Sequence, residues 1–146
     1  MPLAATSPTD RARQMTALTI RLGERLEAET LCLLAQRPQD IYAGIEETRS
    51  LSNLYRHESM RIKADPSLLA GISAIDKKAL REATVQFEER LRKYGLAVNA
   101  AKTITEGVIS AVAADLHTRR NQTSLYGARG RQLDSGPQSL NFGRKA

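Results

Sequence analysis

Residues able to perform chemistry are few in this chain and far apart. The two histidines, His57 and His117, have no second histidine or cysteine at the spacing that holds zinc. The single cysteine, Cys32, lies in the apolar run Leu31–Leu34, where we expect it to pack as a small buried hydrophobic side chain. One cysteine forms no internal disulfide, which agrees with a reducing cytoplasm. The sequence therefore predicts no metal site.

Two pairs of acidic side chains, Glu46–Glu47 and Glu88–Glu89, are neighbours in the sequence. Consecutive residues point about 100° apart on a helix, so neighbouring carboxylates do not converge on one substrate. Glu88 with Arg92, and Glu89 with Lys93, have instead the spacing of i,i+4 ion pairs. No nucleophile elbow surrounds the serines of this region, which are Ser50, Ser52 and Ser59. We expect a protein that is not an enzyme and that needs no cofactor.

Positive charge is concentrated at the C-terminal end. The chain has a net charge of +6, and from His117 onward six basic residues and one acid, Asp134, give +5. Arginines can contact phosphates, but Tyr126 and Phe142 are the only aromatic residues in this stretch, and no nucleic-acid motif is present. Nucleic acid is therefore not the expected partner, although a helical nucleic-acid-binding protein that uses this basic end is an alternative. The six basic residues are Arg119, Arg120, Arg129, Arg131, Arg144 and Lys145.

Two helices are predicted in the first half of the chain. Ser7 followed by Pro8 indicates the start of a helix that continues to about Gln36, before Pro38. A second helix is predicted over 40–63, and it is expected to be the least stable because two serines interrupt its apolar face. The inward residues of this second helix are expected to be Ile41, Ile45, Thr48, Leu51, Tyr55 and Ile62, and the two serines are Ser52 and Ser59.

A third and much longer helix is predicted from Ser73 to about Asn121. Ser73 and Asp76 have the spacing of a capping box, and apolar residues then recur in steps of four and three. Such a seam packs against other helices. The first two helices have about 25 residues each and cannot cover it, so one half must project, bend or pair with something else. The seam consists of Phe87, Leu91, Tyr94, Val98, Ala101, Val108 and Val112.

We therefore predict an all-α fold, an antiparallel helical bundle of two shorter helices and one long C-terminal helix, followed by a flexible tail. The bundle domain is predicted to cover residues 1–121 and the basic tail residues 122–146. Apolar side chains recur at intervals in the glycine-containing tail, which suits a segment that folds upon a partner. The candidate partner-binding residues are Leu116, Leu125, Tyr126, Arg129, Arg131, Leu133, Leu140 and Phe142.

Four stretches of the sequence resemble the FlgN-type flagellar export chaperones. They are Asn99–Lys102, Thr105–Ile109 and Leu125–Gly130, with a looser match at Glu27–Leu31. The resemblance implies a small cytoplasmic helical chaperone that binds hook-associated proteins of the hook–filament junction and keeps them unassembled before type III export. It implies that the C-terminal segment binds the client, and export-apparatus components are further candidate partners.

The N-terminus has neither the basic region nor the apolar region of a secretion signal, and no apolar run is long enough to cross a membrane. We therefore expect a cytoplasmic protein without membrane insertion. Besides the nucleic-acid-binding alternative, a structural coiled-coil subunit without a client is compatible with the long apolar seam.

Overall fold

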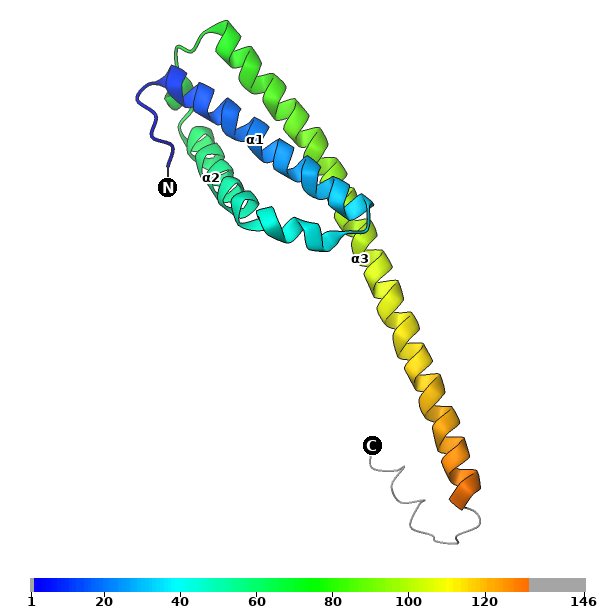
Figure 1. Cartoon of the computed structure of the whole chain (residues 1–146). Helices are drawn as coiled ribbons and strands as arrows, with labels where there is room; N and C mark the ends of the chain where they lie inside the picture. The colour runs from blue at the N-terminus through cyan, green and yellow to red at the C-terminus, as the bar shows by residue number, and fades with distance from the viewer. Residues whose placement is uncertain (1, 132–146) are drawn as a thin grey trace. The chain divides into compact units, whose positions relative to one another are not determined.

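The structure is a computed structural model that describes residues 2–131, with side chains described as far as Leu125. It contains the α-helices α1 (Pro8–Leu34), α2 (Ile45–Ala64) and α3 (Ala74–Arg131), as Figure 1 shows. Two short 3₁₀ helices, η1 (Pro38–Gly44) and η2 (Pro66–Leu69), lie in the connections. Residues 2–131 contain no strand, so the predicted all-α fold of two shorter helices and one long helix is confirmed.

The chain divides into two compact units, Met1–Lys102 and Thr103–Ala146. The first unit contains α1, α2 and the part of α3 that ends at Lys102. The described part of the second unit is the rest of α3, up to Arg131.

The helices of the first unit form an up–down–up bundle. The first turn of α1 pairs with the end of α2, because Arg11 Nη1 lies 2.8 Å from Glu58 Oε2, so α1 and α2 are antiparallel. The start of α1 also pairs with the start of α3, where Arg13 Nε lies 3.0 Å from Asp76 Oδ1. Consecutive helices are therefore antiparallel, as predicted, and α1 runs parallel to this part of α3 (Figure 1).

The core of this bundle lies where α1 faces the other two helices. Leu22 and Leu26 of α1 and Phe87 of α3 form a buried cluster, against which Leu51, Tyr55 and Tyr94 pack. The rings of Tyr55 and Phe87 lie 4.8 Å apart between centroids and are tilted by 44°, a favourable aromatic arrangement. The core thus joins all three helices at mid-bundle.

The predicted seam of α3 is only partly buried. Phe87 is buried, but Leu91 and Val98 are exposed, and α3 instead buries the small residues Ala83 and Ala97. The seam prediction is therefore wrong at Leu91 and Val98. The reason is that α3 buries its small residues together with Phe87 and leaves Leu91 and Val98 at the edge of the bundle.

The predicted helix starts are confirmed by their caps. The Ser7 hydroxyl accepts a hydrogen bond from the Asp10 N–H at 3.1 Å, and Pro8 occupies the first turn. Ser73 accepts from the Asp76 N–H at 3.1 Å and donates its hydroxyl to Asp76 Oδ2 at 2.8 Å. These caps satisfy N–H groups that have no partner inside the helix.

Helix α1 ends in a Schellman motif with glutamine in the position that usually holds glycine. Gln36 has a φ of 56°, the Arg37 N–H donates to the Cys32 carbonyl at 2.9 Å, and the Gln36 N–H donates to the Leu33 carbonyl at 3.1 Å. A left-handed conformation costs a residue with a Cβ atom about 1–2 kcal/mol.

Replacing Gln36 by glycine is therefore expected to raise the free energy of unfolding by about 0.5–1 kcal/mol, measured by urea denaturation. Gln39→Gly is the matched control, because Gln39 lies inside η1 and has no positive φ. That control is expected to destabilise the protein. A lower urea midpoint for Gln36→Gly would contradict the cap assignment.

Helix α2 begins five residues later than predicted, at Ile45 rather than about Asp40, because η1 comes first. Gly44 is the last residue of η1, and a Cβ atom at this position would overlap the guanidinium of Arg25. Arg25 in turn lies 3.7 Å from Glu47 Oε2. The guanidinium of an α1 side chain thus packs onto Gly44, a contact that local sequence does not reveal.

Helix α3 ends at Arg131, ten residues beyond the predicted end at Asn121. Gly127 and Gly130 lie inside it, since a glycine costs only about 1 kcal/mol in a helix interior and does not stop it. The next proline, Pro137, comes later still. The predicted start of the tail at residue 122 therefore falls within α3, and residues 132–146 lie outside the described part of the chain.

A fully buried glutamate ties the N-terminal segment to α1 and α2. Glu58 Oε1 accepts from the Leu3 N–H and from Arg61 Nη1, each at 3.0 Å, and Arg11 binds the other carboxylate oxygen. Burial raises the pKa of Glu58, but these hydrogen bonds and the two guanidinium charges outweigh it and leave the pKa below its ordinary value. His57 Nδ1 lies 3.6 Å from Glu58 Oε1.

A second buried glutamate joins the three helices at the other end of the bundle. Glu29 of α1 accepts from the Thr48 hydroxyl of α2 at 2.5 Å. On α3, partial burial and then the nearby Glu29 charge raise the pKa of Tyr94, which also hydrogen-bonds Glu29. The apolar core therefore lies between two buried carboxylates that fix the register of the helices.

Candidate partner-binding surface

The candidate binding residues predicted from the sequence lie in three situations. Leu116 and Leu125 are exposed on α3. Tyr126, Arg129 and Arg131 belong to the last turns of α3, where the structure describes the backbone only. The others, Leu133, Leu140 and Phe142, lie outside the described residues.

Leu116 and Leu125 do not form one surface. They are nine positions apart, which is two and a half turns of an α-helix, so their side chains lie on opposite sides of α3. The sequence grouped them because it placed Leu125 in a flexible tail, where helical periodicity does not apply. Among the side chains described as far as Leu125, Leu116 adjoins further apolar side chains.

These side chains form what we call the α3 apolar face. Each of them is 52–63% exposed. Because they recur at helical spacing in the second unit, they lie within about half the circumference of the helix. Thr103, Glu106 and Ser110 lie on the opposite side. The α3 apolar face consists of Ile104, Val108, Ile109, Val112 and Leu116.

Charged residues border the C-terminal end of this face. Asp115 Oδ2 and Arg119 Nε form an i,i+4 ion pair at 3.2 Å, and both side chains are well exposed. Arg120 and His117 lie beside Leu116. The arrangement is an apolar stripe with polar edges, the form of a helix that packs against another helix.

The sequence placed Val108 and Val112 in a seam that packs against other helices, and it placed Ile104 and Ile109 outside that seam. The signal that could have found this face was the length of the seam, which exceeds what two shorter helices can cover. Within the first unit, Phe87 and Tyr94 of the seam pack in the core of the bundle.

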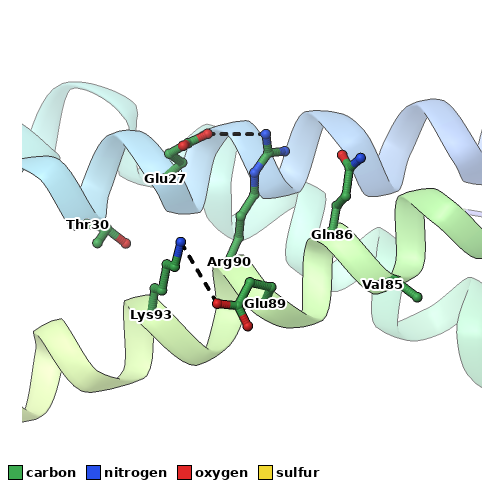
Figure 2. A pocket seen from close by; sticks show the side chains of 7 residues that line it. All are labelled: Glu27, Thr30, Val85, Gln86, Glu89, Arg90 and Lys93. Atoms are coloured by element: carbon green, nitrogen blue, oxygen red, sulfur yellow. Dashed lines mark ion pairs between the residues drawn. The ribbon is translucent and has the colours of Figure 1, made fainter.

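The first unit has a hollow between α1 and α3, shown in Figure 2, with a volume of about 350 Å³. Glu27 Oε2 lies 3.2 Å from Arg90 Nη2, and Glu89 Oε1 lies 3.9 Å from Lys93 Nζ (Figure 2). Arg92 lies 2.8 Å from the same Glu89 oxygen, and its hydrogen bond lowers the pKa of Glu89. Charges that compensate one another in this way are the pattern of a structural ion-pair network.

Arg92 also departs from its predicted partner, since it pairs with Glu89 and not with Glu88. Cys32 is half-buried rather than fully buried, at the edge of the bundle near η1. His57 and His117 are exposed, as expected for surface helix positions. Residues 2–125 contain no group of three potential metal-binding side chains.

No family model matches the chain, and no solved structure matches it. No helix in the described part of the chain is long and apolar enough to cross a membrane. One curated relative is the "Flagellar basal-body protein FlbY" of Caulobacter vibrioides, which is 35% identical over 150 residues. The match covers 100% of this chain and 100% of the relative. Similarity of this extent and level shows common ancestry over the full length, and the chain therefore belongs to the FlbY family of flagellar proteins.

Proposed function

We propose that this protein is a chaperone of flagellar assembly that acts in the cytoplasm and catalyses no reaction. Its client is a hook-associated protein of the hook–filament junction, which it holds unassembled until type III export. Components of the export apparatus are a second class of partner. The flagellar name of the relative supports the assignment to this system, and the resemblance to FlgN-type chaperones supports the kind of activity.

The observation that carries the proposal is the α3 apolar face. Large aliphatic side chains from Ile104 to Leu116 are more than half exposed. An apolar stripe on a helix binds an amphipathic helix of a partner through side chains at i, i+3, i+4 and i+7. A protein that covers the helical end of an assembling subunit needs a surface of this kind.

Co-purification from the cytoplasm of flagellated cells tests the proposal. The tagged full-length chain is expected to retain a hook-associated protein, identified by mass spectrometry. A chain that ends at Lys102 lacks the second unit and is expected to lose this partner. Equal recovery with both chains would place the binding site on the bundle. Recovery that nuclease abolishes would favour nucleic-acid binding by the basic end.

The name of the relative favours a second candidate, a structural subunit of the basal body. A structural subunit stays in the assembled organelle, whereas an export chaperone leaves its client before assembly. Purified basal bodies that contain this chain in fixed proportion to other subunits would support the structural candidate. The chaperone proposal expects the chain to be absent from them.

A further inference from the structure

The first unit has an open apolar groove between α2 and α3, which we call the α2–α3 groove. Its volume is about 460 Å³, and its surface is almost entirely apolar. The buried core residues Leu22 and Leu26 of α1 lie at its floor. The α3 wall consists of Phe87, Leu91 and Tyr94, and the α2 wall of Thr48, Ser52, Tyr55, Arg56, Ser59 and Met60.

The groove is open because its walls alternate small and large side chains. Ser52 and Ser59 are too short to reach across to α3, whereas Met60 is 65% exposed and Leu91 is 46% exposed. Phe87, Leu91 and Tyr94 are spaced by four and three, and Ser52, Tyr55 and Ser59 by three and four. Walls with this periodicity fit the side chains of one further helix, which would complete a four-helix arrangement.

The α2 rim of the groove is basic. Arg49, Arg56 and Lys63 follow one another at intervals of seven, so they lie on one side of α2, and Arg56 itself lines the groove. Within the described residues Arg56 and Lys63 make no ion pair, and Arg49 lies 3.5 Å from the exposed Glu46. The corresponding rim of α3 carries charges of both signs, Glu88 and Arg92. A row of like positive charges therefore borders the groove on the α2 side only.

We propose that the α2–α3 groove binds an amphipathic helix of a partner protein, with acidic residues on the flank that faces α2. Charge argues against the two occupants that this chain could supply. Residues 132–146 carry Arg144 and Lys145 against Asp134, and the stretch from Thr103 to Leu125 has as many basic as acidic side chains. Neither has an acidic flank. This site is separate from the α3 apolar face and does not depend on the identity of the client.

A selection from a peptide library tests the proposal with the full-length chain. The peptides are helices as long as α2, which has 20 residues, with a fixed apolar stripe and flanks drawn from Glu, Gln and Lys. We expect enrichment of Glu on one flank only, because the α2 rim is uniformly basic whereas the α3 rim carries charges of both signs. Enrichment of Lys or Gln on both flanks would overturn the proposal.

The most enriched peptide is then measured by fluorescence anisotropy against three variants. Ser59→Leu fills the groove and is expected to weaken binding at least about tenfold. Arg56→Glu keeps the groove open and reverses a rim charge, which is expected to weaken binding about tenfold and to shift selection toward Lys. Ser50→Leu, an exposed position outside the groove, is the control and is expected to bind as the unmodified chain does.

Equal binding by Ser59→Leu and Arg56→Glu would show that the peptide binds elsewhere and would overturn the proposal. Two further results would overturn the proposed partner helix and identify another occupant of the groove. A chain that ends at Arg131 and binds the peptide more tightly would identify residues 132–146 as the occupant. A dimer in light scattering that Ser59→Leu dissociates would identify a second copy. Arg56 is exposed, so its substitution leaves a folded protein to measure even if the Ser59 variant unfolds.

Discussion

Replacing Glu58 by glutamine is expected to lower the free energy of unfolding by about 3 kcal/mol at neutral pH. The carboxylate is fully buried and binds Arg11, Arg61 and the Leu3 N–H. A neutral amide leaves the Arg11 guanidinium, itself almost buried, without a compensating charge. It also presents N–H groups to donors that need an acceptor. Urea denaturation followed by circular dichroism measures the loss.

The same residue makes stability depend on pH in a defined direction. The pKa of Glu58 is lower in the folded chain than its ordinary value of 4.5. The folded state therefore prefers the charged form, and this contribution is complete above the unfolded pKa. It is lost as the pH falls below about 4.5 through the folded pKa. We expect the unmodified chain to lose stability over this acid range more steeply than Glu58→Gln.

Glu24→Gln provides the control, because Glu24 is an exposed glutamate of α1. Its effect is expected to stay within about 0.5 kcal/mol. Equal stability of Glu58→Gln and the unmodified chain at neutral pH would contradict the role assigned to the buried carboxylate. An equally steep loss of stability with falling pH in Glu58→Gln and in the unmodified chain would also contradict it.

Replacing Val112 and Leu116 together by serine is expected to weaken client binding by about 3–4 kcal/mol, or several hundred-fold in Kd. Both side chains belong to the α3 apolar face and are more than half exposed in the free chain. Their burial against a client helix supplies the binding energy that serine cannot. Titration calorimetry with a purified hook-associated protein measures the change.

Leu125→Ser is the matched control for this prediction. Leu125 is as exposed as Leu116 and lies on the same helix, but on its opposite side. It is expected to change binding by less than about 0.5 kcal/mol. A large loss with Leu125→Ser and none with Val112 and Leu116 would return the site to the C-terminal end originally predicted. Folding of the first unit is expected to be unchanged in all these variants.

The three helices, and the starts of α1 and α3, could be predicted from the sequence because the signals for them are local. Ser7 with Pro8, and Ser73 with Asp76, cap helices through contacts within one turn. The start of α2 was placed too early, because η1 comes directly before it and no side-chain cap marks the start at Ile45. The end of α3 was placed too early because the cost of single glycines was overestimated.

The buried Glu58 was also missed, although the pattern contained it. Leu51, Tyr55 and Ile62 were predicted to face inward, and Glu58 fills the vacant position in the same series of four, three and four. A charged residue at such a position is ordinarily assigned to solvent. Only the tertiary structure supplies the two arginines and the backbone N–H that make its burial favourable.

The binding surface was predicted in part. The sequence indicated that the long seam lacks enough helices to cover it, and Leu116 proved to belong to the exposed stripe. The sequence placed most candidate residues farther along the chain, because isolated apolar residues among glycines suggested a tail. Helical geometry then separated Leu116 from Leu125.

The most direct test of the chaperone proposal is the assembly of a hook-associated protein followed by light scattering, with and without the full-length chain. The proposal predicts that an equimolar amount of the chain suppresses the increase in scattering, and that the variant with serine at positions 112 and 116 does not. Assembly that proceeds unchanged in the presence of the full-length chain, at concentrations where both proteins stay folded, would contradict it.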